Sequence, residues 1–515
     1  EDKYLKYNLN KNGTDSGATL LTSIGTNPTR IIDSGTIEGG GTNTYSLNLW
    51  ITDEVDGNYS GQVFSGKLRV EVSQERQTVA ETLLANIPKE NFYDDGTDTF
   101  ITGEDPNNYI WYSGKLWRAV SVNNEEKTVK LVTQWNISAI SYDDYSSAFE
   151  SSYMEDWLND TSVDGFLGNL RDYENFIVMD SVWDATMEDR ELGSIERPNG
   201  ETTVIDSVGL LNIYEYQSSN NGGTAGYLNN GLYWWTSSPY SATVVRNVYS
   251  DGRVGGNGSL NSFGVRPSIN LKTSIKIIDG DGTEDNPYRL AGDNDTNLSG
   301  TLLSSRYSGE YIKFGNNDNN LYRIVSHENG IGTKITSAEP LKSSDGFIGM
   351  TFGNDVTFSS ENDVGKFLNG EYLISYVDSE YREMIEDSTT WYLGTVGSRD
   401  SYKLAKYTDI AMSSITSSAT GAKVGLLRLG ELMAGQFERY IVKGGTSSTG
   451  LTTTYWTITP YGFSSVRFIN NEGDANSGIS SNAYSVRPTM NLKSNVVITS
   501  GDGTLQNPFE IKLDS

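Results

Sequence analysis

The sequence contains no cysteine, and its only histidine is His327. The absence of cysteine excludes disulfide bonds, thiolate nucleophiles and cysteine-ligated metal sites. One histidine without cysteine cannot form a zinc site, and it permits a Ser/His/Asp triad only if His327 is the base. No G-x-S-x-G stretch is present, so we expect His327 to be a solvated loop residue.

Long apolar runs and positive charge are also scarce. No run of 18 apolar residues occurs, so no segment is expected to span a membrane as a helix. The chain has 39 Lys and Arg against 67 Asp and Glu, which gives a formal net charge of -28. A nucleic-acid-binding protein needs a cationic face to neutralise phosphates, so we expect no nucleic-acid partner. The 31 tyrosines and 54 glycines favour strands and loops.

What the sequence does contain is an internal repeat. Residues 235–290 align with residues 456–511 at a constant offset of 221, without a gap, and 22 of the 56 positions are identical. The shared patterns are WT..PY, VRP, NLK and GDGT..NP. Upstream, VGLLNIYEY matches VGLLRLGEL, which aligns Glu215 with Glu431. The chain therefore carries the same domain twice.

We predict four regions: a β-sandwich domain at 1–75, a helical linker at 76–98, repeat 1 at 99–292 and repeat 2 at 293–515. Strands of the first region are predicted at 3–10, 29–37, 42–51 and 63–72. The linker helix, at 78–87, begins with a capping box of Thr78 and Glu81. The repeats join at the polar run 291–295. The predicted fold is an all-β sandwich followed by two tandem α+β domains.

The first region has few strands for a closed sandwich. An exposed sheet edge is a template for strand addition, so we expect either a strand before Glu1 or one supplied by another molecule. The second option makes the chain a filament subunit, and a chain that stays monomeric at high concentration would contradict it.

Three stretches of this region, TNPTRIIDSGTI, TYSLNLWITDE and FSGKLRVEV, carry a family resemblance. They resemble the camelysin/TasA-like β-sandwich domain of exported proteins from Gram-positive bacteria. The resemblance implies a cell-surface or matrix location and fibre formation.

The repeats carry a second resemblance, in WT..PY followed by a Gly/Asn-rich stretch and VRP..NLK. They resemble the C-type-lectin-like fold of bacterial exported proteins, a group that includes sulfatase-modifying-factor-like domains and the variable proteins of diversity-generating retroelements. An oxidase of the sulfatase-modifying type would need cysteines, which this chain lacks. In this fold, the segment between the Trp strand and the VRP strand forms an exposed face that binds partners.

The two copies differ most within that segment. Framework positions match while intervening positions diverge, which fits one scaffold with two binding surfaces and fits equally the ordinary drift of exposed loops. Candidate ligand-binding residues on this face are Trp234, Tyr240, Arg246, Tyr249, Arg253, Tyr461, Phe463, Arg467, Phe468, Asn470 and Asp474.

Several repeated motifs are predicted to be structural. Arg266 and Arg487 of VRP are expected to pair, buried, with a carboxylate such as Glu215 or Glu431; an anion contact is the alternative. Trp235 and Trp456 are expected in the core, whereas Trp234 alternates with Trp235 and is expected to face outward.

The motif GDGT..NP is the remaining repeated motif. Its first copy contains Asp279, Asp281 and Asp285, which resemble a calcium loop. The second copy lacks most of these carboxylates, so a tight hairpin is expected and no metal or cofactor.

We therefore expect a non-enzymatic, exported cell-surface protein that binds a protein or glycan ligand through its lectin-like repeats. A filament subunit remains an alternative, as does an enzyme on a lectin-like scaffold, because two carboxylates suffice for glycoside hydrolysis.

Overall fold

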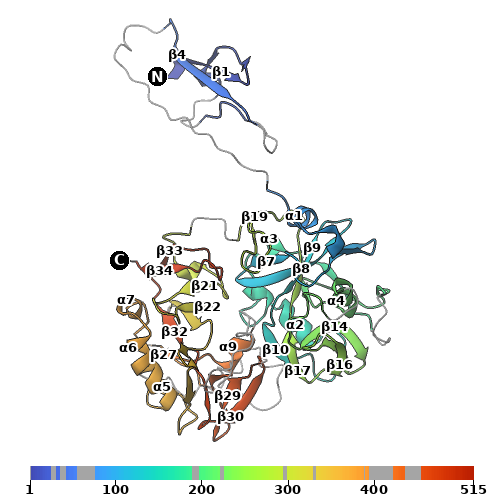
Figure 1. The fold of residues 1–515 in the computed structure, drawn as a ribbon, viewed down its shortest axis with the longest axis vertical. Helices are drawn as coiled ribbons and strands as arrows, with labels where there is room; N and C mark the ends of the chain where they lie inside the picture. Colours follow the sequence, from blue (N-terminus) through green and yellow to red (C-terminus); the bar gives the residue numbers. More distant parts are fainter. Residues whose placement is uncertain are drawn as a thin grey trace. The chain divides into compact units, whose positions relative to one another are not determined.

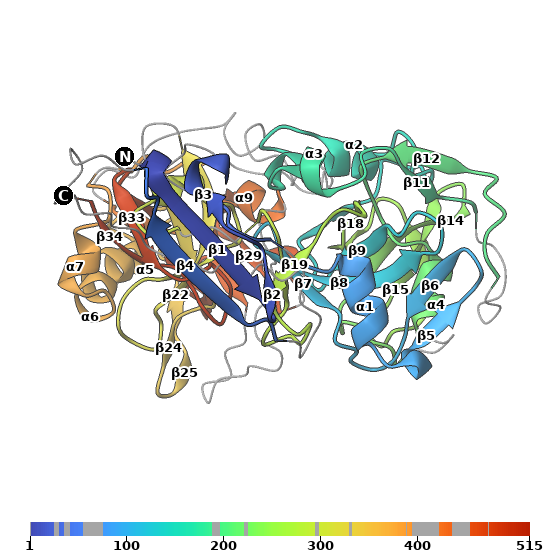
Figure 2. The same ribbon diagram turned by 90° about the horizontal axis from the view of Figure 1, so that it is seen from above.

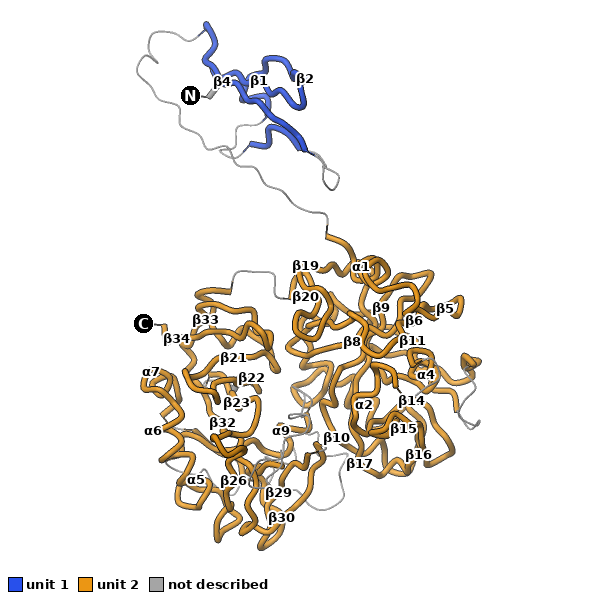
Figure 3. Tube along the Cα trace, in the orientation of Figure 1, with its two compact units in different colours: residues 1–74 blue, residues 75–515 orange. Residues whose placement is uncertain are grey.

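The computed structural model forms two compact units, residues 1–74 and residues 75–515 (Figures 1 and 3). It describes residues 2–24, 30–34, 42–54, 76–187, 196–220, 225–293, 298–328, 332–387, 389–393, 422–434, 454–471 and 473–514. Both units are mostly β-structure with short helices. Within these ranges, no helix combines the length and the apolar character needed to cross a membrane.

The first unit is organised around strand β1 (Leu5–Lys11), which has partners along both edges. Strand β4 (Tyr45–Ile51) pairs antiparallel with the whole of β1. The short strands β2 (Thr14–Asp15) and β3 (Thr19–Leu20) share its other edge. Two of the predicted strands are thus confirmed, as β1 and β4.

Of the other two predicted strands, one is not found and one is not tested. Residues 30–34, the described part of one of them, form no strand. Both edges of β1 are occupied, and this segment is held by side chains instead: Asp33 accepts hydrogen bonds from Lys11 Nζ (2.8 Å) and the Tyr45 hydroxyl (2.9 Å). The segment 63–72 lies outside the described residues, so completion of the domain by a neighbour's strand stays a prediction.

In the second unit, the two repeats lie side by side, and each has its own hydrophobic core (Figures 1 and 2). The first sheet of repeat 1 has the order β13-β18-β9-β8-β7-β20-β19, and the β5–β6 hairpin pairs with β8. Its strands are β5 (Phe92–Asp94), β6 (Asp98–Ile101), β7 (Tyr109–Tyr112), β8 (Lys115–Asn123), β9 (Val129–Thr133), β13 (Val208–Gly209), β18 (Ser268–Leu271), β19 (Ile277–Asp279) and β20 (Tyr288–Leu290). The second sheet, in the order β10-β17-β14-β15-β16, consists of β10 (Ser138–Ser141), β14 (Trp234–Ser241), β15 (Val244–Val248), β16 (Val254–Gly258) and β17 (Ser262–Val265).

Repeat 2 reproduces this arrangement. Its sheets have the orders β21-β22-β23-β32-β27 and β26-β31-β28-β29-β30. Its strands are β21 (Tyr311–Lys313), β22 (Leu321–Glu328), β23 (Gly332–Ser337), β26 (Gly349–Thr351), β27 (Val424–Gly425), β28 (Tyr455–Tyr461), β29 (Ser465–Ile469), β30 (Ala475–Ile479), β31 (Ala483–Ser485) and β32 (Thr489–Leu492). The parallel contact of Trp234 with Gly264 recurs as that of Tyr455 with Ser485. The tandem repeat read from the sequence is therefore confirmed.

Helix α1 (Val79–Asn86) begins as predicted. Thr78 Oγ1 accepts the Glu81 N–H (3.2 Å), and the Glu81 carboxylate accepts the Thr78 N–H (2.8 Å), so the capping box is confirmed. Val79 and Leu83 belong to the core of repeat 1. The structure thus packs this helix into repeat 1, whereas the sequence suggested a linker.

The repeated tryptophans of the WT motif lie in the cores, as predicted. Trp235 and Trp456 are each 1% exposed or less. Their indole N–H groups donate to main-chain oxygens two strands away in the same sheets, Ile140 O on β10 (3.0 Å) and Met350 O on β26 (2.9 Å). Each Trp therefore fixes the position of an edge strand as well as filling the core.

The prediction that Trp234 faces outward is wrong. Its ring is fully buried, packed edge-on to Tyr216 (5.4 Å) and 4.9 Å from the Arg266 guanidinium. Strict alternation does expose every second residue of a strand when one face of the sheet is solvated. Here both faces of β14 are covered, because helix α4 (Ile213–Ser219), which carries Tyr216, lies on the second face.

The prediction that Arg266 and Arg487 pair with Glu215 and Glu431 is also wrong. Arg266 Nε donates to Thr133 O (2.8 Å), and Arg487 Nε donates to the matching Ser337 O (3.1 Å). The repeated arginines thus connect the VRP strand to the neighbouring strand through main-chain carbonyls. The glutamates pair with lysines instead.

The junction of the repeats contains a buried acid. Asp293, expected in a polar linker, is 2% exposed. One carboxylate oxygen accepts the Ser113 N–H (3.3 Å), and the other lies 3.7 Å from Arg171 Nη1. Burial, together with the nearby Glu310 carboxylate, raises the pKa of Asp293 to about 7. A direct contact between the repeats lies next to Ser113, from Arg323 Nη2 to Gly114 O (3.1 Å), and another joins Ser138 Oγ to Met433 O (2.7 Å).

We expect the substitution Asp293→Asn to stabilise the second unit above pH 7. The folded carboxyl keeps its proton up to about pH 7, whereas the unfolded one loses it near pH 4. Stability therefore falls as the pH rises through this window, and the amide abolishes that loss. Thermal unfolding at pH 8 should show the variant more stable by at least ~1 kcal/mol, with little difference from the native chain at pH 4.

The matched control is Asp172→Asn, because Asp172 also lies beside Arg171 but is 53% exposed in its side chain. This control should leave the pH dependence unchanged. An Asp293→Asn chain that is less stable than the native chain at pH 8 would contradict the account.

Candidate functional site

A polar pocket of about 560 Å³ lies in repeat 1. Its walls come from β6, β8, β9, β18, the start of helix α4 and the hairpin of β11 (Ser181–Asp184) and β12 (Thr203–Asp206). Carboxylate, amide and hydroxyl side chains dominate the lining, and only a few apolar residues contribute. Its volume is that of sites for small ligands.

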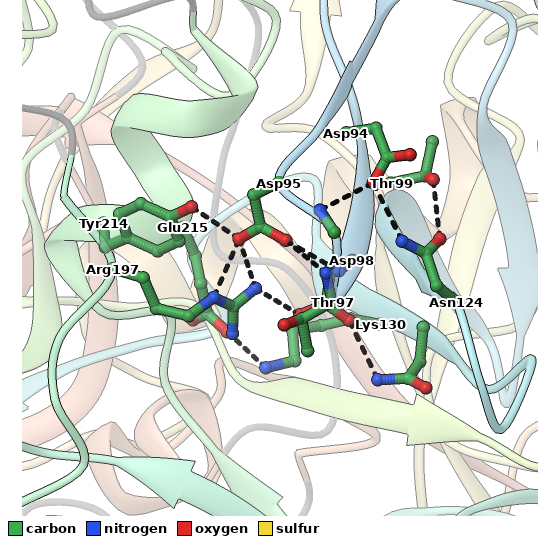
Figure 4. Close-up of polar contacts among 12 residues, drawn as sticks. Asp94, Asp95, Thr97, Asp98, Thr99, Asn124, Lys130, Arg197, Tyr214 and Glu215 are labelled. Carbon is green, nitrogen blue, oxygen red and sulfur yellow. Dashed lines mark hydrogen bonds and ion pairs between the residues drawn. The ribbon is translucent and has the colours of Figure 1, made fainter.

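The first element of the pocket is an ion pair between sheet and helix. Lys130 on β9 contacts the Glu215 carboxylate through its Nζ, 4.8 Å from the Trp183 ring centroid (Figure 4). Glu215 is the third residue of α4, and its second carboxylate oxygen accepts the N–H of the N-cap residue Asn212 (2.9 Å). One glutamate therefore caps the helix and neutralises the lysine.

The second element is a network around Arg197. Arg197 Nε donates to Asp95 (2.7 Å) and Nη2 donates to Asp98 (2.6 Å), so that one guanidinium spans both carboxylates (Figure 4). The Tyr214 hydroxyl also donates to Asp95 (2.6 Å). Asp95 lies in the loop of the β5–β6 hairpin, and Asp98 is the first residue of β6. Asp95 Oδ1 accepts the N–H groups of Thr97 and Asp98, which fixes the loop.

The contacts of this network move the pKa values of Asp95 and Tyr214 away from neutral pH. Burial alone would raise the pKa of Asp95, but hydrogen bonds from the Asp98 N–H, Tyr214, the Thr97 N–H and Arg197 outweigh it, and the pKa lies below the usual value. Burial and the Asp95 hydrogen bond raise the pKa of Tyr214. At neutral pH both groups therefore keep their ordinary charge states.

Repeat 2 contains the same ion pair, but there both side chains are almost completely buried. Lys334 Nζ lies 2.6 Å from Glu431, with side chains 4% and 2% exposed, against 15% and 13% for Lys130 and Glu215. Glu431 is the third residue of helix α9 (Leu429–Met433), and Arg428 Nη2 also approaches it (3.3 Å). Burial opposes ionisation of Glu431, but Lys334 and Arg428 lower its pKa to about 2.

Among the described residues, two side chains near the pair are larger in repeat 2 than in repeat 1. Trp183 and Trp391 occupy equivalent places, because each packs on the matching glycine, Gly209 or Gly425. The next residue is Asp184 in repeat 1 and Tyr392 in repeat 2. The N-cap residue is likewise Asn212 in one and Arg428 in the other. The Arg428 guanidinium lies 5.1 Å from the Tyr392 ring centroid. These two side chains therefore stack on each other, whereas the equivalent residues of repeat 1, Asn212 and Asp184, line the pocket.

The sequence-predicted face is only partly a surface. Tyr240 (42% exposed), Arg253 and Phe463 (fully exposed) do face solvent, and Tyr249, Tyr461, Asn470 and Asp474 are half-buried. The prediction of exposure is wrong for Trp234, Arg246, Arg467 and Phe468, each 9% exposed or less.

The buried members have structural contacts. Arg246 stacks on Tyr240 (4.1 Å to the ring centroid), and the same stack recurs in repeat 2 as Arg467 on Tyr461 (4.2 Å). Phe468 packs against Tyr484 (4.4 Å between centroids). What differs at the surface is the turn after β14 and β28, where Ala242 corresponds to the exposed Phe463.

Two other predicted sites have simple outcomes. In the GDGT motifs, Asp281 and Asp502 each accept hydrogen bonds from the N–H and hydroxyl of the following Thr, as expected of a hairpin turn. The described residues contain no cluster of three or more potential metal-ligating acids or histidines. His327 lies on β22, with Nδ1 3.0 Å from the Thr333 hydroxyl, so its assignment to a loop is wrong.

Reasoning from the sequence missed the pocket. Asp95 and Asp98 fall within the predicted linker at 76–98, although Asp98 lines the pocket and both aspartates bind Arg197. A usable signal existed: Lys130 and Lys334 occupy matching strands, just as Glu215 and Glu431 occupy matching helices. A lysine and a glutamate that recur together in both copies predict an ion pair.

We expect Glu431→Gln to destabilise the chain much more than Glu215→Gln. Removing one partner of a buried ion pair costs about 3–5 kcal/mol, and Lys334 would be left enclosed. Lys130 can reach water in the pocket, so about 1 kcal/mol is expected there. Thermal unfolding at pH 7 compares the two, and equal shifts would contradict the difference in burial. The Glu431 contribution should be present above about pH 4.5 and disappear as the pH falls towards 2.

Comparison with known proteins identifies the repeat. No curated protein and no solved structure matches the chain. The sequence profile of one family matches twice, at residues 127–273 and 354–494, which together make up more than half of the chain. The matches include Glu215 and Glu431 but leave the β5–β6 hairpin outside. The chain therefore belongs to the family described as "Domain of unknown function (DUF6273)" and contains two copies of that domain.

Proposed function

We propose that this chain is a non-enzymatic, exported cell-surface protein and that repeat 1 is its ligand-binding module. The binding site is the polar pocket between the β5–β6 hairpin, the Lys130–Glu215 pair and the β11–β12 hairpin. A C-type-lectin-like fold of each repeat, and a Gram-positive source, belong to the same proposal.

One observation carries this proposal. The two repeats share sheet order, buried tryptophans and the Lys–Glu pair. At the same place in this framework, Asp184 and Asn212 of repeat 1 border open space, whereas Tyr392 and Arg428 of repeat 2 stack on each other. A duplicated scaffold that keeps a pocket in one copy and fills it in the other is typical of specialisation for a ligand.

The ionisation of the pocket favours binding over catalysis. A general acid or base works best with a pKa near the operating pH. The pKa of Asp95 lies below its usual value and that of Tyr214 above, and Arg197 is locked between two carboxylates. These groups hold fixed charges, which suits recognition of a ligand.

The proposal can be tested by filling the pocket. The double substitution Asp184→Tyr and Asn212→Arg installs the residues of repeat 2 in repeat 1. Ligand-detected NMR of the full chain against a library of sugars, amino acids and small amines should give hits that this variant loses by at least ~tenfold in signal.

The matched control is Ala242→Phe, which installs a repeat-2 residue at an exposed turn of repeat 1. It should retain every hit. Hits that persist in the filled variant, or a library without hits on the native chain, would contradict a ligand pocket in repeat 1.

A further inference from the structure

The cationic side chains that line the pocket have acidic partners, whereas several of its acidic side chains have no cationic partner among the described residues. Its two cationic side chains are both neutralised within the site, Lys130 by Glu215 and Arg197 by Asp95 and Asp98. An anionic ligand would have to displace one of these partners, which are short, partly desolvated contacts. The pocket therefore offers no ready cation to an anion.

Further carboxylates surround the opening. Glu125 and Glu126, in the turn between β8 and β9, and Asp180, just before β11, are exposed and line the pocket. Asp184 lines it as well. The described residues provide no ion-pair partner for any of these four. With a chain charge of -28, the pocket has a negative potential, and low-dielectric walls concentrate that potential inside it.

Aromatic stacking is not available to a ligand in this pocket. Tyr214 is the one aromatic residue among the described lining residues. The Arg197 guanidinium lies 5.2 Å from its ring centroid, and Phe100 packs against it edge-to-face at 5.7 Å. Trp183, below Lys130, is 1% exposed. Sugar rings therefore lack the open aromatic face on which they could stack.

The remaining walls suit a ligand that donates hydrogen bonds. Asn270 lines the pocket, and its side-chain carbonyl oxygen accepts no hydrogen bond from the described residues, whereas those of Asn123 and Asn199 already accept main-chain N–H groups. Ammonium and guanidinium groups carry several N–H donors and no acceptor, so they can satisfy carboxylates and amide oxygens together. A volume of about 560 Å³ accommodates one such group with its aliphatic chain.

Resting on the proposed function of this pocket, we propose that its ligand is an organic cation, which presents an ammonium or guanidinium group to Glu125, Glu126, Asp180 and Asp184. The same chemistry is found in a free polyamine and in a basic side chain of a peptide. Because exposed carboxylates supply the attraction, affinity falls as the salt concentration rises.

Isothermal titration of the full chain tests this at low ionic strength. The probes are spermidine, an end-blocked tripeptide with one central lysine, glucose, glutamate and calcium chloride. We expect one or both organic cations to bind and glucose and glutamate not to bind. Binding of spermidine alone identifies a free amine as the ligand, and binding of the peptide identifies a basic side chain.

A pair of charge-matched variants locates the binding. The triple substitution Glu125→Gln, Glu126→Gln and Asp180→Asn removes three exposed carboxylates at the pocket, and should weaken cation binding at least ~tenfold. The control, Glu371→Gln, Glu380→Gln and Glu383→Gln, removes three exposed carboxylates from repeat 2 and should leave affinity unchanged. Equal weakening in both variants would show attraction to net charge only and overturn the proposal.

The remaining outcomes separate this proposal from the proposed function. If glucose or glutamate binds, organic cations do not, and the filled variant Asp184→Tyr/Asn212→Arg abolishes binding, the pocket function stands and the cationic ligand is wrong. Calcium binding without organic-cation binding also overturns the ligand class. If organic cations bind equally to the filled variant, both the ligand assignment and the pocket are wrong.

Discussion

An ion pair between a strand lysine and a helix glutamate is the interaction on which both repeats depend. Lys130–Glu215 and Lys334–Glu431 each connect the first sheet to the N-terminus of a short helix. The glutamate also accepts the N–H of the N-cap residue, which directly precedes that helix. A buried charge requires a partner, so a change of one residue alone is costly, most of all for the nearly inaccessible pair of repeat 2. This constraint keeps the helix, the sheet and the strand that follows in one arrangement in both copies.

The residues around the ion pair differ between the repeats, and so does the exposure of the pair to solvent. In repeat 2, Arg428 contacts Glu431 and stacks on Tyr392, and the Lys–Glu pair is almost fully buried. In repeat 1, smaller residues occupy these positions and the β5–β6 hairpin brings Asp95 and Asp98 to the rim. Since Arg197 binds both aspartates, the pocket gains rigidity without gaining an available positive charge. The same framework thus produces a closed core in one copy and a negatively charged recess in the other.

The sequence predicted the parts of this structure that depend on local or repeated signals. The register of the two copies, the capping box at Thr78, the GDGT turns and the burial of Trp235 and Trp456 follow from such signals. Burial of Trp234 could not be read from alternation, because alternation does not reveal that both faces of a sheet are covered. The partners of Arg266 are main-chain carbonyls, Thr133 O and Leu228 O, which are remote in the sequence and which no side-chain pattern encodes.

The pocket could not be predicted from local sequence signals either. Its walls join Asp98, Lys130, Arg197 and Asn270, which only the order of the strands brings together. The central claim, that one framework is open in repeat 1 and closed in repeat 2, can be measured directly because the chain has no cysteine. Asn270 lines the pocket, whereas its counterpart Asn491 is 1% exposed. Single-cysteine chains Asn270→Cys and Asn491→Cys should differ in native labelling by a small thiol reagent: rapid reaction at the first position and protection at the second. Equal rates at both positions would contradict the account.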